Sequence, residues 1–158
     1  VEENLRMAKP DATKEEMEAV LQKVNLLGFL QTQNGLQTEL LEKAGNLSGG
    51  QCQRLVIARA LLRSDSAVYI FDEAASNIDV ESEELIMNVI HELAKTKTVL
   101  LISHRLANVV QSDQIYFLKN GTICERGTHA ELMEQNGAYR HLYDSQMVLE
   151  NYGKEGNA

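Results

Sequence analysis

Two short apolar runs, separated by a helical segment, constrain the fold of this chain more than any other feature. Residues 67–71 (AVYIF) run directly into Asp72 and Glu73, and residues 98–102 (TVLLI) form the second run. Continuous apolar runs of this length predict strands that are buried on both faces. Residues 80–94 carry apolar side chains at helical spacing, so the order strand, helix, strand predicts a parallel sheet with a right-handed crossover in an α/β fold.

Helical signals precede these runs. Thr13 and Glu16 have the spacing of a capping box, and apolar residues then recur at helical spacing up to Gly28, where we expect the helix to stop. A change in composition follows near residue 64. We therefore expect a helical subdomain over residues 1–64 and an α/β part over residues 65–158.

Turn and capping signals mark the last third of the chain. We expect a short helix over residues 106–111 and a β-hairpin that turns at Asn120 and Gly121. Two more helices should follow, the first capped by Thr128 and the second over residues 138–150.

The charge of the chain limits what it binds. Its 158 residues include 15 Lys and Arg against 23 Asp and Glu, a formal net charge of −8. This balance predicts that the chain coats neither nucleic acid nor an anionic lipid surface. Every apolar run is far shorter than the roughly 18 residues that suggest a membrane span. Cys52 and Cys124 lie far apart, which favours reduced thiols in the cytosol.

Asp72 and Glu73 follow the first run directly, where ligand sites in open α/β sheets form. Asp72 could hold Mg²⁺ through water, and Glu73 could polarise an attacking water. His104 follows the second run, and adjacent parallel strands would bring it to the same edge. Taken alone, an Asp-Glu pair is more often a solvated acidic turn, and a lone histidine is more often structural.

The segment from Ser48 to Gln51 combines a helix start with two glycines, Gly49 and Gly50. Backbone N–H groups without side chains around them, at the positive end of a helix dipole, favour an anion such as phosphate. In isolation the same residues would serve equally well as a helix cap.

Taken in order, these segments resemble the nucleotide-binding domain of ATP-binding cassette (ABC) proteins. The resemblance extends from residues 3–5 to the final hairpin around Gly121, Gly127 and Glu131, and so covers most of the chain. It implies an ATPase with ATP and Mg²⁺ as cofactors. It implies a signature motif of Leu47, Ser48, Gly49, Gly50 and Gln51, which would bind the nucleotide together with Ser76 and Asp79. It also implies that Asp72 is the Walker B magnesium carboxylate, Glu73 the catalytic base, Ser76 to Asp79 the D-loop and His104 the switch histidine.

Residues 38–45 (TELLEKAG) resemble the X-loop that precedes the signature in exporters and senses their membrane domains. This resemblance favours an exporter over an importer. The sequence departs from the family pattern at Lys43-Ala44, where Arg-Gly is usual, and at Cys52, Ala75 and Asn77-Ile78. The last of these departures bears on communication through the D-loop.

A Walker A motif, Gly-x-x-x-x-Gly-Lys-Ser/Thr, occurs nowhere in the sequence. In the family this motif and the Q-loop precede everything found here, and the chain begins at Val1 rather than Met, so we expect a partial domain cut after the Q-loop. A helix N-terminus contributes roughly 0.3 to 1 kcal/mol toward an anion, whereas millimolar affinity needs about 4 kcal/mol. We therefore expect negligible ATP binding and hydrolysis by this chain alone.

In an intact protein, the resemblance implies a head-to-tail dimer with a second nucleotide-binding domain, identical or different, attached to transmembrane domains at the cytoplasmic face of the membrane. ATP would then drive export. Two alternatives stay open. One is an ABC ATPase without a transporter, acting in DNA repair, chromosome maintenance or translation, and the other is a degenerate subunit paired with an active partner.

Overall fold

The computed structural model describes residues 1–155, with side chains described up to residue 149. Two compact units divide the chain, Val1–Ile102 and the part from Ser103 onward. The division that we predict between residues 64 and 65 concerns subdomains of the family rather than compact units, and it stays a prediction. Residues 156–158, at the end of the predicted second part, lie outside the described residues.

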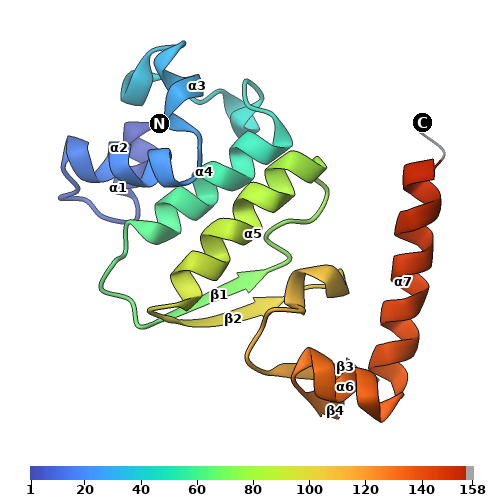
Figure 1. Cartoon of the computed structure of the whole chain (residues 1–158). Coiled ribbons are helices and arrows are strands. Elements are labelled where there is room, and N and C mark those ends of the chain that lie inside the picture. Colours follow the sequence, from blue (N-terminus) through green and yellow to red (C-terminus); the bar gives the residue numbers. More distant parts are fainter. Residues whose placement is uncertain (156–158) are drawn as a thin grey trace. The chain divides into compact units, whose positions relative to one another are not determined.

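The first unit contains helices and a parallel pair of strands. Its α-helices are α1 (Glu2–Arg6), α2 (Lys14–Lys23), α3 (Leu27–Gln31), α4 (Gly49–Leu61) and α5 (Val80–Ala94). Two short 3₁₀ turns, η1 (Gly35–Gln37) and η2 (Glu42–Ala44), lie between α3 and α4. Figure 1 shows α5 between α4 and the strands β1 (Val68–Asp72) and β2 (Thr98–Ile102).

The strands β1 and β2 pair in parallel, with Val68 opposite Thr98 and Asp72 opposite Ile102. This confirms the predicted parallel sheet and its helical crossover. The prediction that the strands are buried on both faces is wrong for this unit, because Val68 and Ile70 are 55% and 65% exposed. Side chains alternate between the faces of a strand, and the helices of this unit cover only one face of the pair.

The helix α2 confirms the predicted capping box, since Thr13 Oγ1 accepts a hydrogen bond from the Glu16 N–H and the Glu16 side chain accepts one from the Thr13 N–H. The predicted stop at Gly28 is wrong. The helix ends at Lys23, and Asn25 adopts the left-handed conformation with φ of 51°. Asparagine tolerates that conformation well, so the chain turns there, and Gly28 lies inside α3.

The second unit begins with the 3₁₀ turn η3 (Leu106–Val109), which is shorter than the helix we expect there. The predicted hairpin is confirmed by the antiparallel strands β3 (Ile115–Lys119) and β4 (Thr122–Gly127). Asn120 and Gly121 have positive φ angles of 52° and 76°, as a tight hairpin turn requires. Two helices follow, α6 (His129–Gln135) and the longer α7 (Ala138–Glu155).

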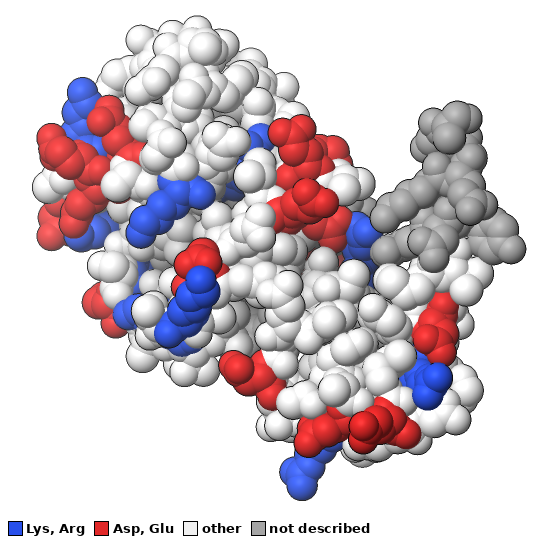
Figure 2. Space-filling view, in the orientation of Figure 1, with Lys and Arg blue, Asp and Glu red and all other residues white. Residues whose placement is uncertain are grey.

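Charged side chains of both signs are spread over the surface of each unit. On the face shown in Figure 2, the Lys and Arg side chains lie apart from one another among Asp and Glu. This distribution agrees with the net charge of −8 and offers no continuous basic surface on that face for a nucleic acid backbone. Across residues 1–155, every helix falls short of the length or the apolar character that a membrane crossing requires.

Candidate functional site

The signature turn, residues 47–51, is a capped helix start. Ser48 is the N-cap of α4, and its Oγ accepts a hydrogen bond of 3.2 Å from the Gln51 N–H. The Gln51 Oε1 in return accepts one of 2.9 Å from the Ser48 N–H. Our interpretation of this segment from the sequence does not use the reciprocal cap, although the Ser-x-x-Gln spacing indicates it. The cap fixes the direction in which the helix begins.

Gly49 and Gly50 are the first two residues of α4, where backbone N–H groups have no acceptor within the helix. The positive end of the helix dipole adds to the attraction for an anion. The two glycines nevertheless have different surroundings, since Gly49 is exposed and Gly50 is buried. The exposed side of the turn can therefore receive a phosphate group.

Asp72 and Glu73 stand at the end of β1, and both are exposed. The Glu73 N–H donates to the Ile102 carbonyl at 2.9 Å, and the Glu73 carbonyl accepts from the Ser76 N–H at 3.0 Å. Glu73 has a φ of 48°, in the left-handed region that a glutamate rarely adopts. Such outliers cluster at functional sites, and this one turns the chain away from the strand.

The rest of the strand-end loop, residues 72–79, leads into α5. Asn77 is left-handed with φ of 58°, and Asp79 is the N-cap of α5, where its Oδ1 accepts from the Ser82 N–H at 2.8 Å. Hydrogen bonds from the Ser82 backbone and hydroxyl lower the pKa of Asp79 below its ordinary value. Asp79 is therefore held as a carboxylate at the helix start.

Asp72 offers an oxygen donor of the kind that Mg²⁺ prefers. Among the described residues, no group of three or more His, Cys, Asp or Glu could hold a metal ion. The described residues therefore suit an ion that binds a single protein carboxylate and takes water and substrate phosphates as its other ligands. Mg²⁺ usually binds in this way in phosphoryl-transfer sites.

His104 is exposed near the start of the second unit, two residues after β2 ends. Its carbonyl accepts a hydrogen bond of 2.7 Å from the Gln146 Nε2 on α7, and the Gln146 Oε1 accepts one of 2.9 Å from the Leu106 N–H. One amide thus holds the backbone on both sides of Arg105. The sequence interpretation does not include Gln146, because a contact across 42 residues leaves no local pattern.

Residues 38–45 form a loop around η2 that is exposed from Leu41 to Lys43, whereas Thr38 is buried. Asn46 holds it, because its side chain accepts from the Leu41 N–H and donates to the Glu39 carbonyl. Lys43 and Ala44 both have φ of 54°. A glycine adopts this conformation without strain, which explains physically why the family pattern favours Gly where this chain has Ala44.

The predicted site residues thus occupy a helix start and two loops that follow parallel strands. A family model described as ABC transporter matches residues 1–76. An uncharacterized ABC transporter ATP-binding protein of Haemophilus influenzae is 51% identical over 156 residues, which is 99% of this chain and 28% of that relative. The chain belongs to the ABC transporter family.

Other members of the ABC transporter family match nearly as far. An ATP-dependent lipid A-core flippase of Mannheimia succiniciproducens is 46% identical over 88% of this chain and 24% of its own length. A putative multidrug export ATP-binding/permease protein of Staphylococcus aureus is 42% identical over 92% of this chain and 25% of its own length. The chain spans about a quarter of the length of these relatives.

A solved structure, described as a bacterial Atm1-family ABC exporter with ATP bound, resembles this chain with a TM-score of 0.83 and 30% identity. The match covers 92% of this chain and 25% of the exporter chain. The resemblance to an exporter nucleotide-binding domain and the α/β fold class are therefore confirmed. The roles of individual residues in this ABC transporter domain stay predictions.

Proposed function

We propose that this chain is part of an ATP-hydrolysing nucleotide-binding domain that powers export across a membrane. One observation carries the proposal. Asp72 pairs with Ile102 at the ends of two parallel strands, so the strand-end loop and the loop that begins at Ser103 leave the sheet at the same level. This is where α/β folds bind their ligands.

The signature turn would act on a nucleotide held by a second nucleotide-binding domain in a head-to-tail dimer. Its capped start, formed by Leu47, Ser48, Gly49, Gly50 and Gln51, presents backbone N–H groups of the first helical turn and suits the γ-phosphate of ATP. The Walker A loop of that second domain would anchor the rest of the nucleotide. ATP thereby joins two domains that would otherwise separate.

Within its own half-site, Glu73 would orient the attacking water and accept its proton as the γ-phosphate bond to the β-phosphate breaks. Asp72 would hold Mg²⁺ through water, and the ion when bound neutralises phosphate charge. The His104 imidazole would donate a hydrogen bond to a γ-phosphate oxygen as charge develops there. Ser76 and Asp79 would set the position of the loop that carries Glu73.

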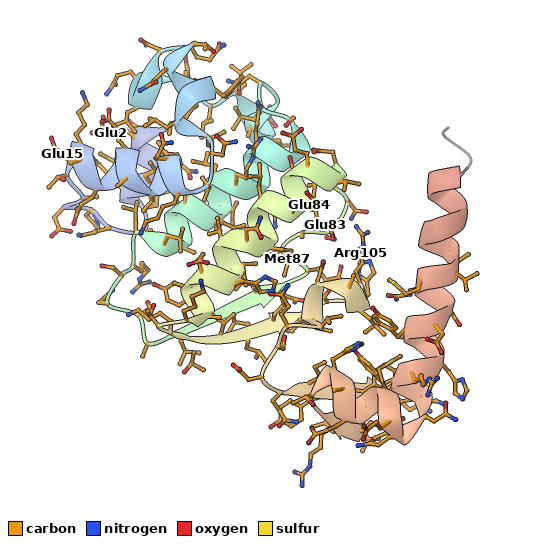
Figure 3. All side chains as sticks on the ribbon, viewed as in Figure 1. Glu2, Glu15, Glu83, Glu84, Met87 and Arg105 are labelled. Carbon is orange, nitrogen blue, oxygen red and sulfur yellow. The ribbon has the colours of Figure 1, made fainter. Side chains whose placement is uncertain are left out.

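Replacing Glu73 in the intact transporter tests the assignment. Glu73→Gln keeps the size of the side chain and removes the base, so turnover should fall roughly 10² to 10⁴-fold, about 3 to 5 kcal/mol of barrier. Glu84→Gln is the matched control, since Glu84 is an exposed carboxylate on α5 (Figure 3) outside the site. Wild-type turnover in the Glu73→Gln variant, measured by phosphate release, would remove Glu73 from this role and favour a degenerate subunit.

Binding of ATP to this chain alone should be negligible, because its described site supplies a helix start and few ligands for the triphosphate. A helix N-terminus contributes at most about 2 kcal/mol, whereas micromolar binding needs about 8 kcal/mol. Isothermal calorimetry with Mg²⁺ and ATP should give no measurable heat of binding. Micromolar affinity would refute the split of the site between two domains.

The proposed place of the domain is the cytoplasmic face of a membrane, coupled to transmembrane domains through residues 38–45. The exposed Leu41, held by Asn46 in that loop, is the side chain most available for such a contact. An exporter is favoured over a non-transport ABC ATPase because relatives are described as a lipid A-core flippase and a multidrug export protein. A Leu41→Cys variant of the intact transporter should form cross-links to its membrane domains, and no cross-link would count against this contact.

A further inference from the structure

The two glycines of the signature turn meet different neighbours. A Cβ added at Gly49 would find only the Ile78 Cγ2, at 4.0 Å. A Cβ added at Gly50 would lie 2.3 Å from the Ser82 Oγ, 2.8 Å from the Ser82 Cβ and 3.1 Å from the Asp79 Oδ2. The Ser82 Oγ can rotate away, but its Cβ is fixed to the backbone of α5. A larger residue than glycine does not fit at position 50, because α5 passes next to it.

Ser82 lies next to both the signature turn and Asp79. It is 5% exposed, its N–H donates to the Asp79 Oδ1 at 2.8 Å, and its hydroxyl also hydrogen-bonds the Asp79 carboxylate, which lowers the pKa of Asp79. The same side chain occupies the space where a Cβ at Gly50 would lie. One small buried residue thus contacts both the signature turn and the end of the strand-end loop.

Arg54 contacts the same region. Its Nε donates to the Gly50 carbonyl at 3.3 Å, and its Nη1 donates to the Asn25 carbonyl at 3.0 Å. Its positive charge also lowers the pKa of Asp79. Gly50 is thus bonded to Arg54 through its carbonyl and packed against Ser82 and Asp79, which leaves little room for the turn to move independently of Asp79.

We propose that Ser82 is a positioning residue that couples the signature turn to the strand-end loop through contact with Gly50. This inference rests on the proposed function, in which the signature turn acts on the nucleotide of the second domain and the strand-end loop carries Glu73 of its own half-site. A shift of the signature turn on ATP binding is then passed through Ser82 to Asp79 and the loop that carries Glu73. Gly50 serves packing as well as access to phosphate.

Second-site rescue in the intact transporter tests this coupling. Gly50→Ala should lower kcat at least 10-fold with little change in KM for ATP, because the nucleotide is anchored mainly elsewhere. Ser82→Gly removes the two nearest of the three atoms that the new methyl group meets and leaves only the Asp79 Oδ2, at 3.1 Å. The double variant should therefore return to within about 2-fold of Ser82→Gly alone. Ser82→Ala leaves the Cβ in place and should rescue less. Gly49→Ala is the matched control, and Ser82→Gly should not restore whatever activity it loses.

Unfolding temperatures of the same variants separate the outcomes. Gly50→Ala should unfold at a lower temperature, and Ser82→Gly should restore much of that loss. A double variant that regains stability but keeps the low kcat of Gly50→Ala would overturn the proposal, as would wild-type kcat in Gly50→Ala. If Gly50→Ala fails to fold, the Gly50→Ala, Ser82→Gly double variant should fold, and its failure to fold would overturn the proposal. Failure of the proposed function is seen separately, as full turnover in Glu73→Gln.

Discussion

The two loops that follow the parallel strands are held by different kinds of contact. The strand-end loop after β1 is fixed by the Glu73 N–H bond to the backbone of Ile102 in β2, by the left-handed Asn77 and by the cap at Asp79. The loop after β2 has a local turn, in which the Ser103 hydroxyl hydrogen-bonds the N–H and the carbonyl of Arg105, and it is also held by Gln146, a side chain 42 residues away from His104. The base of the proposed site therefore depends on backbone contacts and a helix cap, whereas the sensor depends in addition on a side chain from a distant part of the sequence.

The largest effect should come from removing the distant support. Gln146→Leu in the intact transporter keeps the size of the side chain and loses both hydrogen bonds, each of about 0.5 to 1.5 kcal/mol. Because a small displacement of a catalytic group is costly, we expect kcat for ATP to fall about 10-fold with little change in KM.

Gln135→Leu is the control for this change, since Gln135 is exposed on α6 and should tolerate leucine without loss of turnover. If Gln146→Leu turns over ATP at the wild-type rate, the loop after β2 does not need α7, and the contrast between the loops fails.

A smaller effect should follow from straining the local support. Asn77 has a φ of 58°, and a β-branched residue adopts that region only at a cost of about 1 to 2 kcal/mol. Asn77→Val should lower the free energy of unfolding by about 1 kcal/mol and turnover a few-fold, whereas Asn77→Gly should keep the stability. Denaturant titration compares them, and equal stability of the two variants would show that the loop is not held by this conformation.

The smallest effect should be on the pH dependence of stability. Hydrogen bonds from Ser82 lower the pKa of Asp79 in the folded chain, so ionised Asp79 stabilises the fold at neutral pH, and this contribution is lost as the pH falls below about 4. Asp79→Asn still caps the helix but does not titrate. Its unfolding temperature should drop less than that of wild type between pH 7 and pH 3, and an equal drop would show that the ionisation of Asp79 does not stabilise the fold.

The sequence predicts local features well and contacts between distant segments poorly. Thr13, Asp72 and Asn120 mark a helix start, a strand end and a hairpin, because caps, apolar runs and turn residues act over a few positions. The exposure of Val68 and Ile70 could not be predicted, because a five-residue apolar run has the same pattern whether one face or both are covered.

The residues of the candidate site likewise fall into those that the sequence predicts and those that it does not. Asp72, Glu73 and the signature turn stand out in the sequence through their position and their family resemblance. Ser82 and Gln146 do not, because one is an ordinary helix residue and the other acts across the whole second unit. Their importance depends on which atoms packing brings together, and no local spacing encodes this.

The most direct test of the central claim uses two copies of the intact transporter linked in tandem. Glu73→Gln disables the half-site of its own copy, and Ser48→Arg places a bulky cation in the signature turn that serves the other copy. With both changes in one copy, each nucleotide site carries one defect, so ATP hydrolysis should be lost. With the changes in opposite copies, one site keeps both native parts and should hydrolyse ATP at least 10-fold faster. Equal rates in the two arrangements would contradict a site divided between two domains.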